Sequence, residues 1–271
     1  MSDPDRLYTV GAPPHLRSPR SLTRMHHWTV LALIPTALFG AIGHAFGPRA
    51  TAVDPADAGI GSLSGIVQML TREMGVDSGP LWLLGILGTV ALASGFAVLV
   101  EYVSQMAMRQ PYRALDGHAA LMGVLLALLL PPTVPVWVLL IGVVVAVFLG
   151  KQLYGGLGSY PMHPAVVGWL VLVLSWPNWI YPVGMDSVAS ATATTVVLTA
   201  AGGLLLWARG WIKPQIPLGT LASVAVFSLL FAGRLEGTFG DQFLKGHVFL
   251  AAFFLATDPT SSPANRRGRW L

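Results

Sequence analysis

Long apolar stretches separated by short charged segments set the pattern of this chain. Residues 28–47 contain no charge, and a helix of this length crosses the hydrocarbon core at about 1.5 Å per residue. Residues 80–108 are interrupted only by Glu101, and residues 118–150 carry no charge. Further apolar runs lie at 165–176, 190–208, 216–233 and 247–256. The pattern predicts an all-α polytopic membrane protein with about eight membrane-spanning helices.

Glycine and proline break these runs at defined places. Pro131-Pro132-Thr133-Val134-Pro135 divides residues 118–150, so this run is either two crossings joined by a turn or a pair of partial helices that meet inside the protein. Residues 155–164 hold three glycines and two prolines, which excludes a regular helix. A proline-containing turn also follows the last run, at 257–263. Two such breaks in corresponding halves are typical of inverted repeats with broken helices.

The distribution of charged residues predicts how the chain is oriented in the membrane. Only 10% of the 271 residues are charged, against about 25% in soluble domains. The basic residues lie between apolar segments, which argues against nucleic-acid binding and agrees with the positive-inside rule. We therefore predict a cytoplasmic segment at 1–27 and one transmembrane domain at 28–271. The cations that place the N-terminus inside are Arg109, Arg113, Lys151, Arg209, Lys213 and the final arginines.

The chain has no cysteine, so disulfide, iron–sulfur and thiolate chemistry are excluded from it. Its seven histidines are scattered along the chain and mostly lie at the ends of predicted spans. Facing pairs for haem are therefore not expected, and no spacing predicts a metal site. Any redox centre must be an organic cofactor or belong to a partner.

A hydroxyl-rich segment, residues 186–194, precedes one of the spans. It begins at Asp186 and carries Ser187, Ser190, Thr192 and Thr194. A helix starting at Ser190 would direct unpaired backbone N–H groups and its positive dipole end toward an anion. The same residues could also form an ordinary helix N-cap. By the charge pattern this segment lies on the outer side.

Three other polar features are candidates. Glu101 lies in an apolar span and is an ion-path candidate, although it is near the inner edge and could reach out to the interface. Asp258 either closes an Asx-type turn at a broken helix end or forms a polar floor to a central cavity. Gly155, Gly156 and Gly158 either permit close backbone approach or cradle a phosphate, without the Lys-Ser/Thr ending of a Walker loop.

Four motifs resemble one family, that of the Rnf complex D subunit and the B subunit of sodium-translocating NADH:quinone reductase. The likeness covers nearly the whole chain. The motifs are Pro14-His15-Leu16-Arg17 with Leu22-Thr23-Arg24-Met25, Leu130-Pro131-Pro132-Thr133, Lys151-Gln152-Leu153-Tyr154-Gly155-Gly156-Leu157-Gly158, and Phe253-Phe254-Leu255-Ala256-Thr257-Asp258-Pro259.

The resemblance implies an FMN-carrying membrane subunit of an ion-translocating electron-transport complex in the bacterial inner membrane. The family attaches FMN through its phosphate to a threonine in a Ser-Gly-Ala-Thr motif, which here reads Ala189-Ser190-Ala191-Thr192. Thr192 is thus the expected attachment site. A second flavin (riboflavin), quinone, lipid, and membrane and periplasmic subunits are the implied partners, and the chain would not be catalytic alone. The implied fold is that of urea transporters, with inverted repeats at about 28–150 and 163–271.

Three features depart from the family. The attachment motif matches at Ala191 and Thr192 but not at the two preceding positions. Tyr160 and His163 stand where the family has asparagine. The chain is also expected to be a C-terminally short member, with an incomplete second repeat. Two alternatives therefore stay open: a flavin-free channel or transporter of the urea-transporter type, and a scaffold subunit without a cofactor.

Overall fold

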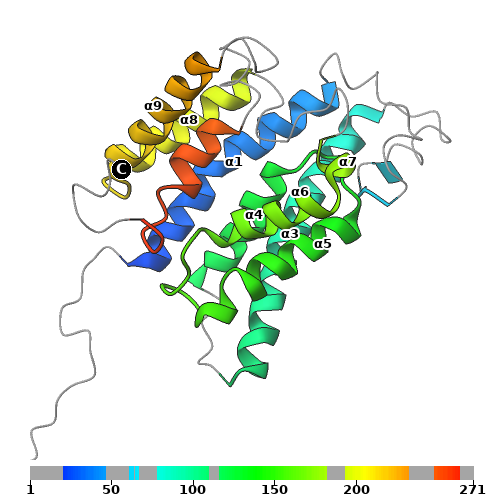
Figure 1. Ribbon diagram of the computed structural model, residues 1–271. Coiled ribbons are helices and arrows are strands. Elements are labelled where there is room, and N and C mark those ends of the chain that lie inside the picture. The colour runs from blue at the N-terminus through cyan, green and yellow to red at the C-terminus, as the bar shows by residue number, and fades with distance from the viewer. Residues whose placement is uncertain are drawn as a thin grey trace, which may run out of the picture.

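The computed structural model describes residues 21–46, 61–63, 65–66, 78–109, 116–181, 193–231 and 247–262. These residues form helices and turns without a β-sheet (Figure 1). Three helical stretches are long and apolar enough to cross a membrane, at Leu22–Phe46, Pro80–Ala107 and Val136–Tyr154, and shorter apolar helices pack with them. The predicted fold class, an all-α polytopic membrane protein, is therefore confirmed. The number of crossings and the inverted repeats remain predictions.

The helices follow the apolar runs closely. The N-terminal half contains α1 (Leu22–Phe46), α3 (Ser78–Ala107), α4 (His118–Leu129), α5 (Val136–Val144), the π-helix η2 (Val145–Leu149) and the 3₁₀-helix η3 (Gln152–Tyr154). The C-terminal half contains α6 (Pro164–Ser175), α7 (Pro177–Ile180), α8 (Ala193–Ala208), α9 (Gln215–Leu230), α11 (Val248–Leu250) and the π-helix η5 (Ala251–Leu255).

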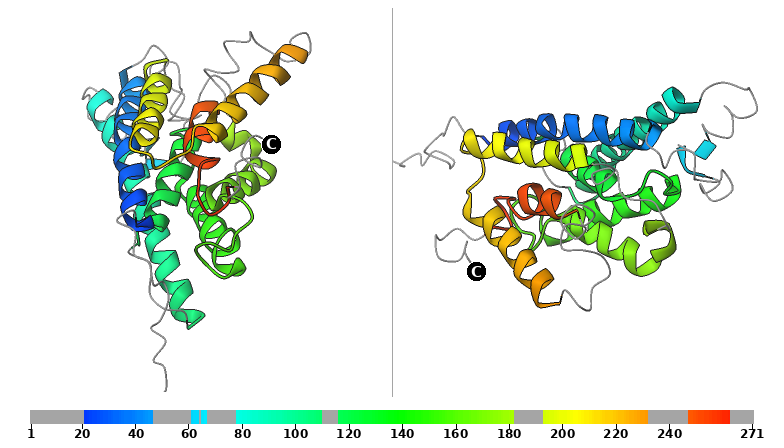
Figure 2. Two further views of the ribbon diagram at one scale, coloured as in Figure 1. Left: turned by 90° about the vertical axis from the view of Figure 1, so that its left-hand side faces the viewer. Right: turned by 90° about the horizontal axis from the view of Figure 1, so that it is seen from above.

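Helices α1 and α8 lie side by side in all three views (Figures 1 and 2). They run antiparallel, because Thr199 Oγ1 donates a hydrogen bond to Thr36 Oγ1 (3.2 Å) while the Arg209 guanidinium lies 4.0 Å from the centre of the Trp28 ring. Gly202 makes the close approach possible, since a Cβ there would lie 2.7 Å from the carbonyl oxygen of Ala32. Small residues and interhelical hydrogen bonds are common at helix contacts in membranes.

Helices α3 and α4 form the most extensive contact between elements. A Cβ at Gly123 would lie 2.4 Å from the Ala93 carbonyl oxygen, so the two backbones touch. Helices α5 and α6 pack beside this pair, and α9 projects away from it, contacting η5 and α11 (Figure 2). Such contacts hold the ends of α1, α3, α4 and α6 in fixed relative positions.

The double-proline segment resolves how residues 118–150 are arranged. Helix α4 has 12 residues and is about 18 Å long, which is too short to cross a hydrocarbon core of about 30 Å. The following residues Leu130–Val134 are all buried. Two full crossings are therefore wrong for this run: α4 is a partial helix that ends inside the protein, and α5 continues through η2 into a longer helical stretch.

The π-helices η2 and η5 both end where a longer helix breaks. Gly150 N donates to Val145 O (2.9 Å) after η2, and Ala256 N donates to Ala251 O (2.8 Å) after η5. Each wide turn is followed by a break in the helix and a buried polar residue, Lys151 in the first case and Asp258 in the second. Single π-turns within helices are frequent at functional sites, which directs attention to these two breaks.

Candidate functional site

Polar side chains from five parts of the chain meet inside the protein, at the end of the bundle where α1 begins and α3 ends. They come from α1, the last turns of α3, the start of α4, the irregular segment 151–163 and the turn after η5. We call them the buried polar cluster. Its members are His26, Glu101, Gln105, His118, Lys151, Gln152, Tyr160, His163 and Asp258, none more than 6% exposed.

An ion pair lies at one side of the cluster. Lys151 Nζ donates to Glu101 Oε1 at 2.5 Å, and both side chains are 1% exposed. The amides of Gln105 and Gln152 donate to the same oxygen, at 2.9 and 3.4 Å. Among the described residues, Glu101 Oε2 and Gln152 Oε1 are buried without a hydrogen-bond partner.

One alternative for these charges is corrected. Glu101 does not reach out to the interface, because it is fully buried, and its ion-path role stays a prediction. Lys151, one of the cations that the charge pattern places on the inner side, is buried against the Glu101 carboxylate. Burying either charge alone would cost several kcal/mol, so a partner within hydrogen-bond distance is the physical reason for both placements.

A group of aromatic rings lies beside the ion pair. Tyr160 Oη and His118 Nε2 are 2.8 Å apart. The His118 ring contacts His26 edge-on, with centroids 4.8 Å apart, and lies 6.3 Å from the His163 ring. His26 Nδ1 is 3.3 Å from the carbonyl oxygen of Asp116, whose carboxylate accepts from the His118 backbone N–H at 2.9 Å.

The segment after Lys151 positions two of these rings. His163 caps α6, since its Nδ1 accepts a hydrogen bond from Ala165 N at 3.2 Å. Burial lowers the pKa of His163 to about 4, although the Asp258 carboxylate opposes this shift. Burial also raises the pKa of Tyr160 well above its ordinary value. Both groups are therefore neutral at pH 7.

The three candidate glycines shape this segment through their backbone angles. Gly155, Gly156 and Gly158 have φ values of 99°, 92° and 100°, which favour glycine. A Cβ at Gly158 would meet nothing within 4 Å, so close approach is not the reason for glycine there. Gly156 N donates to Lys151 O at 3.1 Å, which closes the turn that follows Lys151. A role in cofactor binding stays a prediction.

Asp258 forms the turn expected of it. Its Oδ2 accepts hydrogen bonds from the Thr260 hydroxyl and from Ser261 Oγ (3.4 Å), and its backbone carbonyl accepts from Ser262 N at 3.0 Å. The negative charge of Asp258 adds to burial in raising the pKa of the Tyr160 phenol. The local turn and the contact with the cluster therefore coexist, and binding of a cofactor by Asp258 remains a prediction.

The hydroxyl-rich segment belongs to the other end of α8. Thr192, Ser190 and Asp186 lie outside the described residues. Thr194 is exposed in the first turn of α8, next to the exposed Ala193. Fifteen residues separate Thr194 from Arg209, which lies over Trp28, so the two ends of α8 are about 22 Å apart along the helix. Thr194 therefore lies far from the buried polar cluster.

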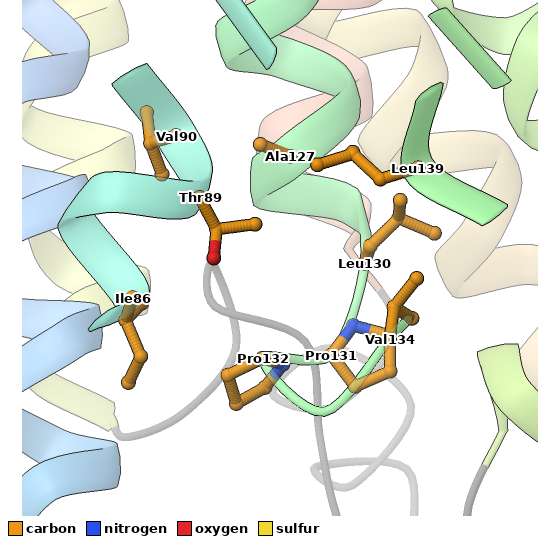
Figure 3. Close-up of a pocket in the computed structure, with 9 residues that line it drawn as sticks. All are labelled: Ile86, Thr89, Val90, Ala127, Leu130, Pro131, Pro132, Val134 and Leu139. Carbon is orange, nitrogen blue, oxygen red and sulfur yellow. The ribbon is translucent and has the colours of Figure 1, made fainter. Parts of the chain in front are cut away.

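A small apolar pocket separates α3 from the double-proline segment (Figure 3). Its volume is about 10 Å³, room for about one water molecule. Thr89 is the one hydroxyl in its lining, and it donates to Gly85 O of its own helix at 2.9 Å. The pocket thus has neither the size nor the polar groups for a flavin. Within the described residues, no group of histidines and carboxylates is arranged to hold a metal ion.

Three of the histidines that are scattered along the sequence come together in the fold. His26, His118 and His163 are far apart in sequence, but each lies at the N-terminal end of a helix. The charge pattern places these three helix ends on the same side of the membrane. The sequence could therefore have predicted that the three histidines lie at a similar depth. The charge pattern also assigns Lys151 to this side, but only the fold brings Lys151 to Glu101 and Tyr160 to His118.

Comparison with known proteins gives consistent results. The NQR2, RnfD, RnfE family matches residues 9–197 and 185–271. The D subunit of an ion-translocating oxidoreductase complex from Methanosarcina acetivorans is 32% identical over 195 residues, covering 68% of this chain and 66% of that protein. The D subunit of the proton-translocating ferredoxin:NAD(+) oxidoreductase complex from Clostridium ljungdahlii is 26% identical, covering 97% and 82%. A D subunit from Ectopseudomonas mendocina is 34% identical, covering 69% and 72%.

Proposed function

Because the chain belongs to the NQR2, RnfD, RnfE family, we propose that it is a membrane subunit of an ion-translocating oxidoreductase complex. Within that complex it carries FMN on Thr192 and passes electrons between flavin or quinone partners, coupled to movement of Na⁺ or H⁺. The observation that carries the proposal is the family match over nearly the whole chain. The relatives that match most of its length are D subunits of such complexes.

The start of α8 supports the flavin part of the proposal. Thr192 lies outside the described residues and directly precedes Ala193 in the sequence, the first described residue of α8. The first turn of a helix has N–H groups without intrahelical partners, and its dipole favours an anion such as a phosphate ester. Ala193 and Thr194 are exposed, so small, accessible side chains follow the attachment site. FMN bound there would supply one-electron redox chemistry.

The protein's own residues would then contribute in two places. At the start of α8, the backbone N–H groups would hold the phosphate in position. At the other end of the bundle, the Glu101–Lys151 pair and the rings beside it would provide a buried polar region for the ion coupled to electron transfer. Ionisable groups inside membrane proteins commonly mark such paths. The identity of the ion is left to experiment.

The test is covalent flavin on the purified full chain. The wild-type band on a denaturing gel should fluoresce, and mass spectrometry should find the modification on Thr192. Thr192→Val should abolish the fluorescence while leaving membrane insertion unchanged. Thr194→Val is the matched control, because it removes a neighbouring hydroxyl of the same kind and should keep the flavin.

Each contrary result leads to a defined conclusion. Flavin that persists in Thr192→Val but disappears in Thr194→Val or Ser190→Ala would move the attachment site. A colourless wild-type band with unmodified Thr192 would refute covalent attachment. In that case, co-purification with other subunits would identify a scaffold subunit, and purification alone would favour a flavin-free channel or transporter.

A further inference from the structure

The start of α1 and the end of α8 form a basic and aromatic surface at one end of the bundle. The two helices are antiparallel, so the first turns of α1 lie beside the last turn of α8 (Figure 2). Three exposed cations come from these segments and the turn after α8: Arg24, Arg209 and Lys213. Neither residues 21–28 nor residues 205–213 include an aspartate or a glutamate. We call the three cations together with Trp28 the basic surface.

Arg209 is held in place on this surface by an aromatic ring. Its guanidinium lies over the ring of Trp28, 4.0 Å from the ring centre, and the face of the indole attracts the positive charge. This contact uses none of the five N–H donors of the guanidinium. Among the described residues, no group accepts a hydrogen bond from them. The guanidinium is therefore oriented and can still bind an anion through two N–H groups, the geometry that suits a phosphate.

A glycine turn fixes where α8 ends and therefore where Arg209 lies. Gly210 N donates to Trp207 O at 2.7 Å, and Trp211 N donates to Leu206 O at 3.0 Å. Gly210 has a φ of 69°. These two hydrogen bonds and the left-handed glycine form a Schellman motif, which ends a helix at a defined residue. Arg209 directly precedes that glycine, so its position beside α1 is set by the local sequence.

Arg24 adds a cation from the neighbouring helix. It precedes Trp28 by four residues on α1, which places the two residues on the same face, one turn apart. Side chains in helices lean toward the N-terminus, so the Trp28 ring leans toward the turn that carries Arg24. Arg209 lies over that ring. Two arginines from different helices are therefore placed on either side of Trp28, where one anionic group can interact with both.

Exposed apolar side chains continue from the basic surface along both helices. Leu31 follows Trp28 by three residues on α1, and Leu205 precedes Arg209 by four residues on α8, so each lies on the same helix face one turn further into the membrane. They are 52% and 44% exposed. A free phosphate or an acidic peptide would match the cations but would leave these apolar side chains uncovered. A phospholipid matches both, because its phosphate lies at the interface and its acyl chains lie along the apolar part of the helices.

We propose that the basic surface binds an anionic phospholipid, with the lipid phosphate at Arg209 and Arg24 and an acyl chain along Leu31 and Leu205. Trp28 acts as a positioning residue, because it orients the Arg209 guanidinium. An anionic lipid such as phosphatidylglycerol fits better than phosphatidylcholine, whose choline group would bring a further positive charge to three cations. The lipid site lies at the opposite end of α8 from the proposed flavin site. It requires only that the chain is in a membrane, so either proposal can fail without the other.

The test titrates the purified full chain in detergent with dioleoylphosphatidylglycerol or dioleoylphosphatidylcholine, and native mass spectrometry counts the lipid molecules retained. The wild type should retain one phosphatidylglycerol more tightly than any phosphatidylcholine. In Arg209→Gln the dissociation constant for phosphatidylglycerol should rise about tenfold, the change expected when one charge-assisted interaction is lost. Arg109→Gln is the matched control, because Arg109 is exposed at the same end of the bundle, after α3, without a cation–π contact in the described part of the chain. Its affinity should equal that of the wild type.

Trp28→Leu separates the ring from the charge. It keeps Arg209 and an apolar side chain but removes the ring that orients the guanidinium, so the dissociation constant should rise about threefold. Unchanged binding in this variant would overturn the positioning role of Trp28. A loss in Arg109→Gln as large as in Arg209→Gln would show general attraction between cations and anionic lipid, and would overturn the site.

Two measurements on the wild type decide even if no variant folds. Equal retention of the two lipids would overturn the proposal and would favour an acidic segment of a partner subunit as the occupant. Inorganic phosphate is the second probe, and it should not displace the bound phosphatidylglycerol, because it lacks the acyl chains. Displacement by phosphate at the concentration of the lipid would identify a site for a free anion and would overturn the assignment to a lipid.

Discussion

The two ends of the α1–α8 pair are built on different principles. At one end, α8 begins with the exposed Ala193 and Thr194, and its candidate chemistry depends on a short local motif. At the other end, α1 begins beside nine polar residues from five parts of the chain, all buried. The contrast shows that in this protein a functional group can be supplied either by a few consecutive residues or by long-range packing, with different consequences for stability.

The first consequence concerns the ion pair, where we expect the largest effect. Lys151→Met leaves the Glu101 carboxylate buried without its cation, and removing one partner of a buried pair costs about 3–5 kcal/mol. Thermal and denaturant unfolding of the purified chain in detergent would measure the loss. Lys213→Met is the control, because Lys213 is exposed and a surface substitution should change stability by less than about 0.5 kcal/mol.

The double variant Glu101→Gln/Lys151→Met sharpens the same point. A neutral amide beside methionine removes the uncompensated charge, so much of the lost stability should return. If Lys151→Met alone is no more destabilising than Lys213→Met, the pair does not hold this end of the bundle together. The two ends of the α1–α8 pair would then differ in how exposed their side chains are, but not in how much they contribute to stability.

An intermediate effect is expected at His163 and should depend on pH. The folded chain binds this proton only near pH 4, while the unfolded chain binds it near the ordinary value of 6.5. The stability from the neutral ring is thus fully present above pH 6.5 and is lost as pH falls toward 4. His163→Asn removes the titrating ring and keeps an N-cap acceptor, so its stability should fall less over that window.

Parallel unfolding curves of wild type and His163→Asn, measured from pH 7 to pH 4, would check this. All other titrating groups are the same in both chains, so the difference between the curves isolates His163. His163→Ala serves as the control for the cap itself and should lose about 1 kcal/mol at pH 7. Identical pH slopes in the histidine and asparagine chains would show that His163 does not titrate in the folded state as expected.

The contrast between the two ends also explains how far the sequence could predict the structure. Long apolar runs predicted α3, where Glu101 is the one interruption, and α8, because a helix in lipid needs apolar side chains on most of its surface. The broken segment 155–164 was predicted from its glycines and prolines, whose backbone preferences are local. The approach of Glu101 to Lys151, fifty residues away, has no local signal. It depends on how α3 packs against η2 and η3, and the same holds for His118 and Tyr160.

The double-proline segment shows what the hydrophobic pattern alone could not predict. The segment at Pro131 and Pro132 could either be an exposed turn between two membrane crossings or a buried break between partial helices. Composition could not separate them, since a buried loop and an exposed turn use the same residues. Packing decides, because the loop is covered by its neighbours and Val136 N donates to Gly61 O at 2.9 Å. Non-helical backbone is tolerated at membrane depth only when protein covers it.

The smallest change in stability is expected at the start of α8, and it completes the comparison. Thr194 is exposed and has no hydrogen bond to another helix within the described part of the chain, so Thr194→Val should alter the free energy of unfolding by less than about 0.5 kcal/mol. Buried Thr199, which donates to Thr36 across the helix pair, is the contrasting position on the same helix, and Thr199→Val should cost about 1 kcal/mol. Denaturant unfolding of both variants would measure the difference. A Thr194→Val chain as destabilised as Thr199→Val would show that the start of α8 also depends on packing, and chemistry and stability could then not be separated at this end.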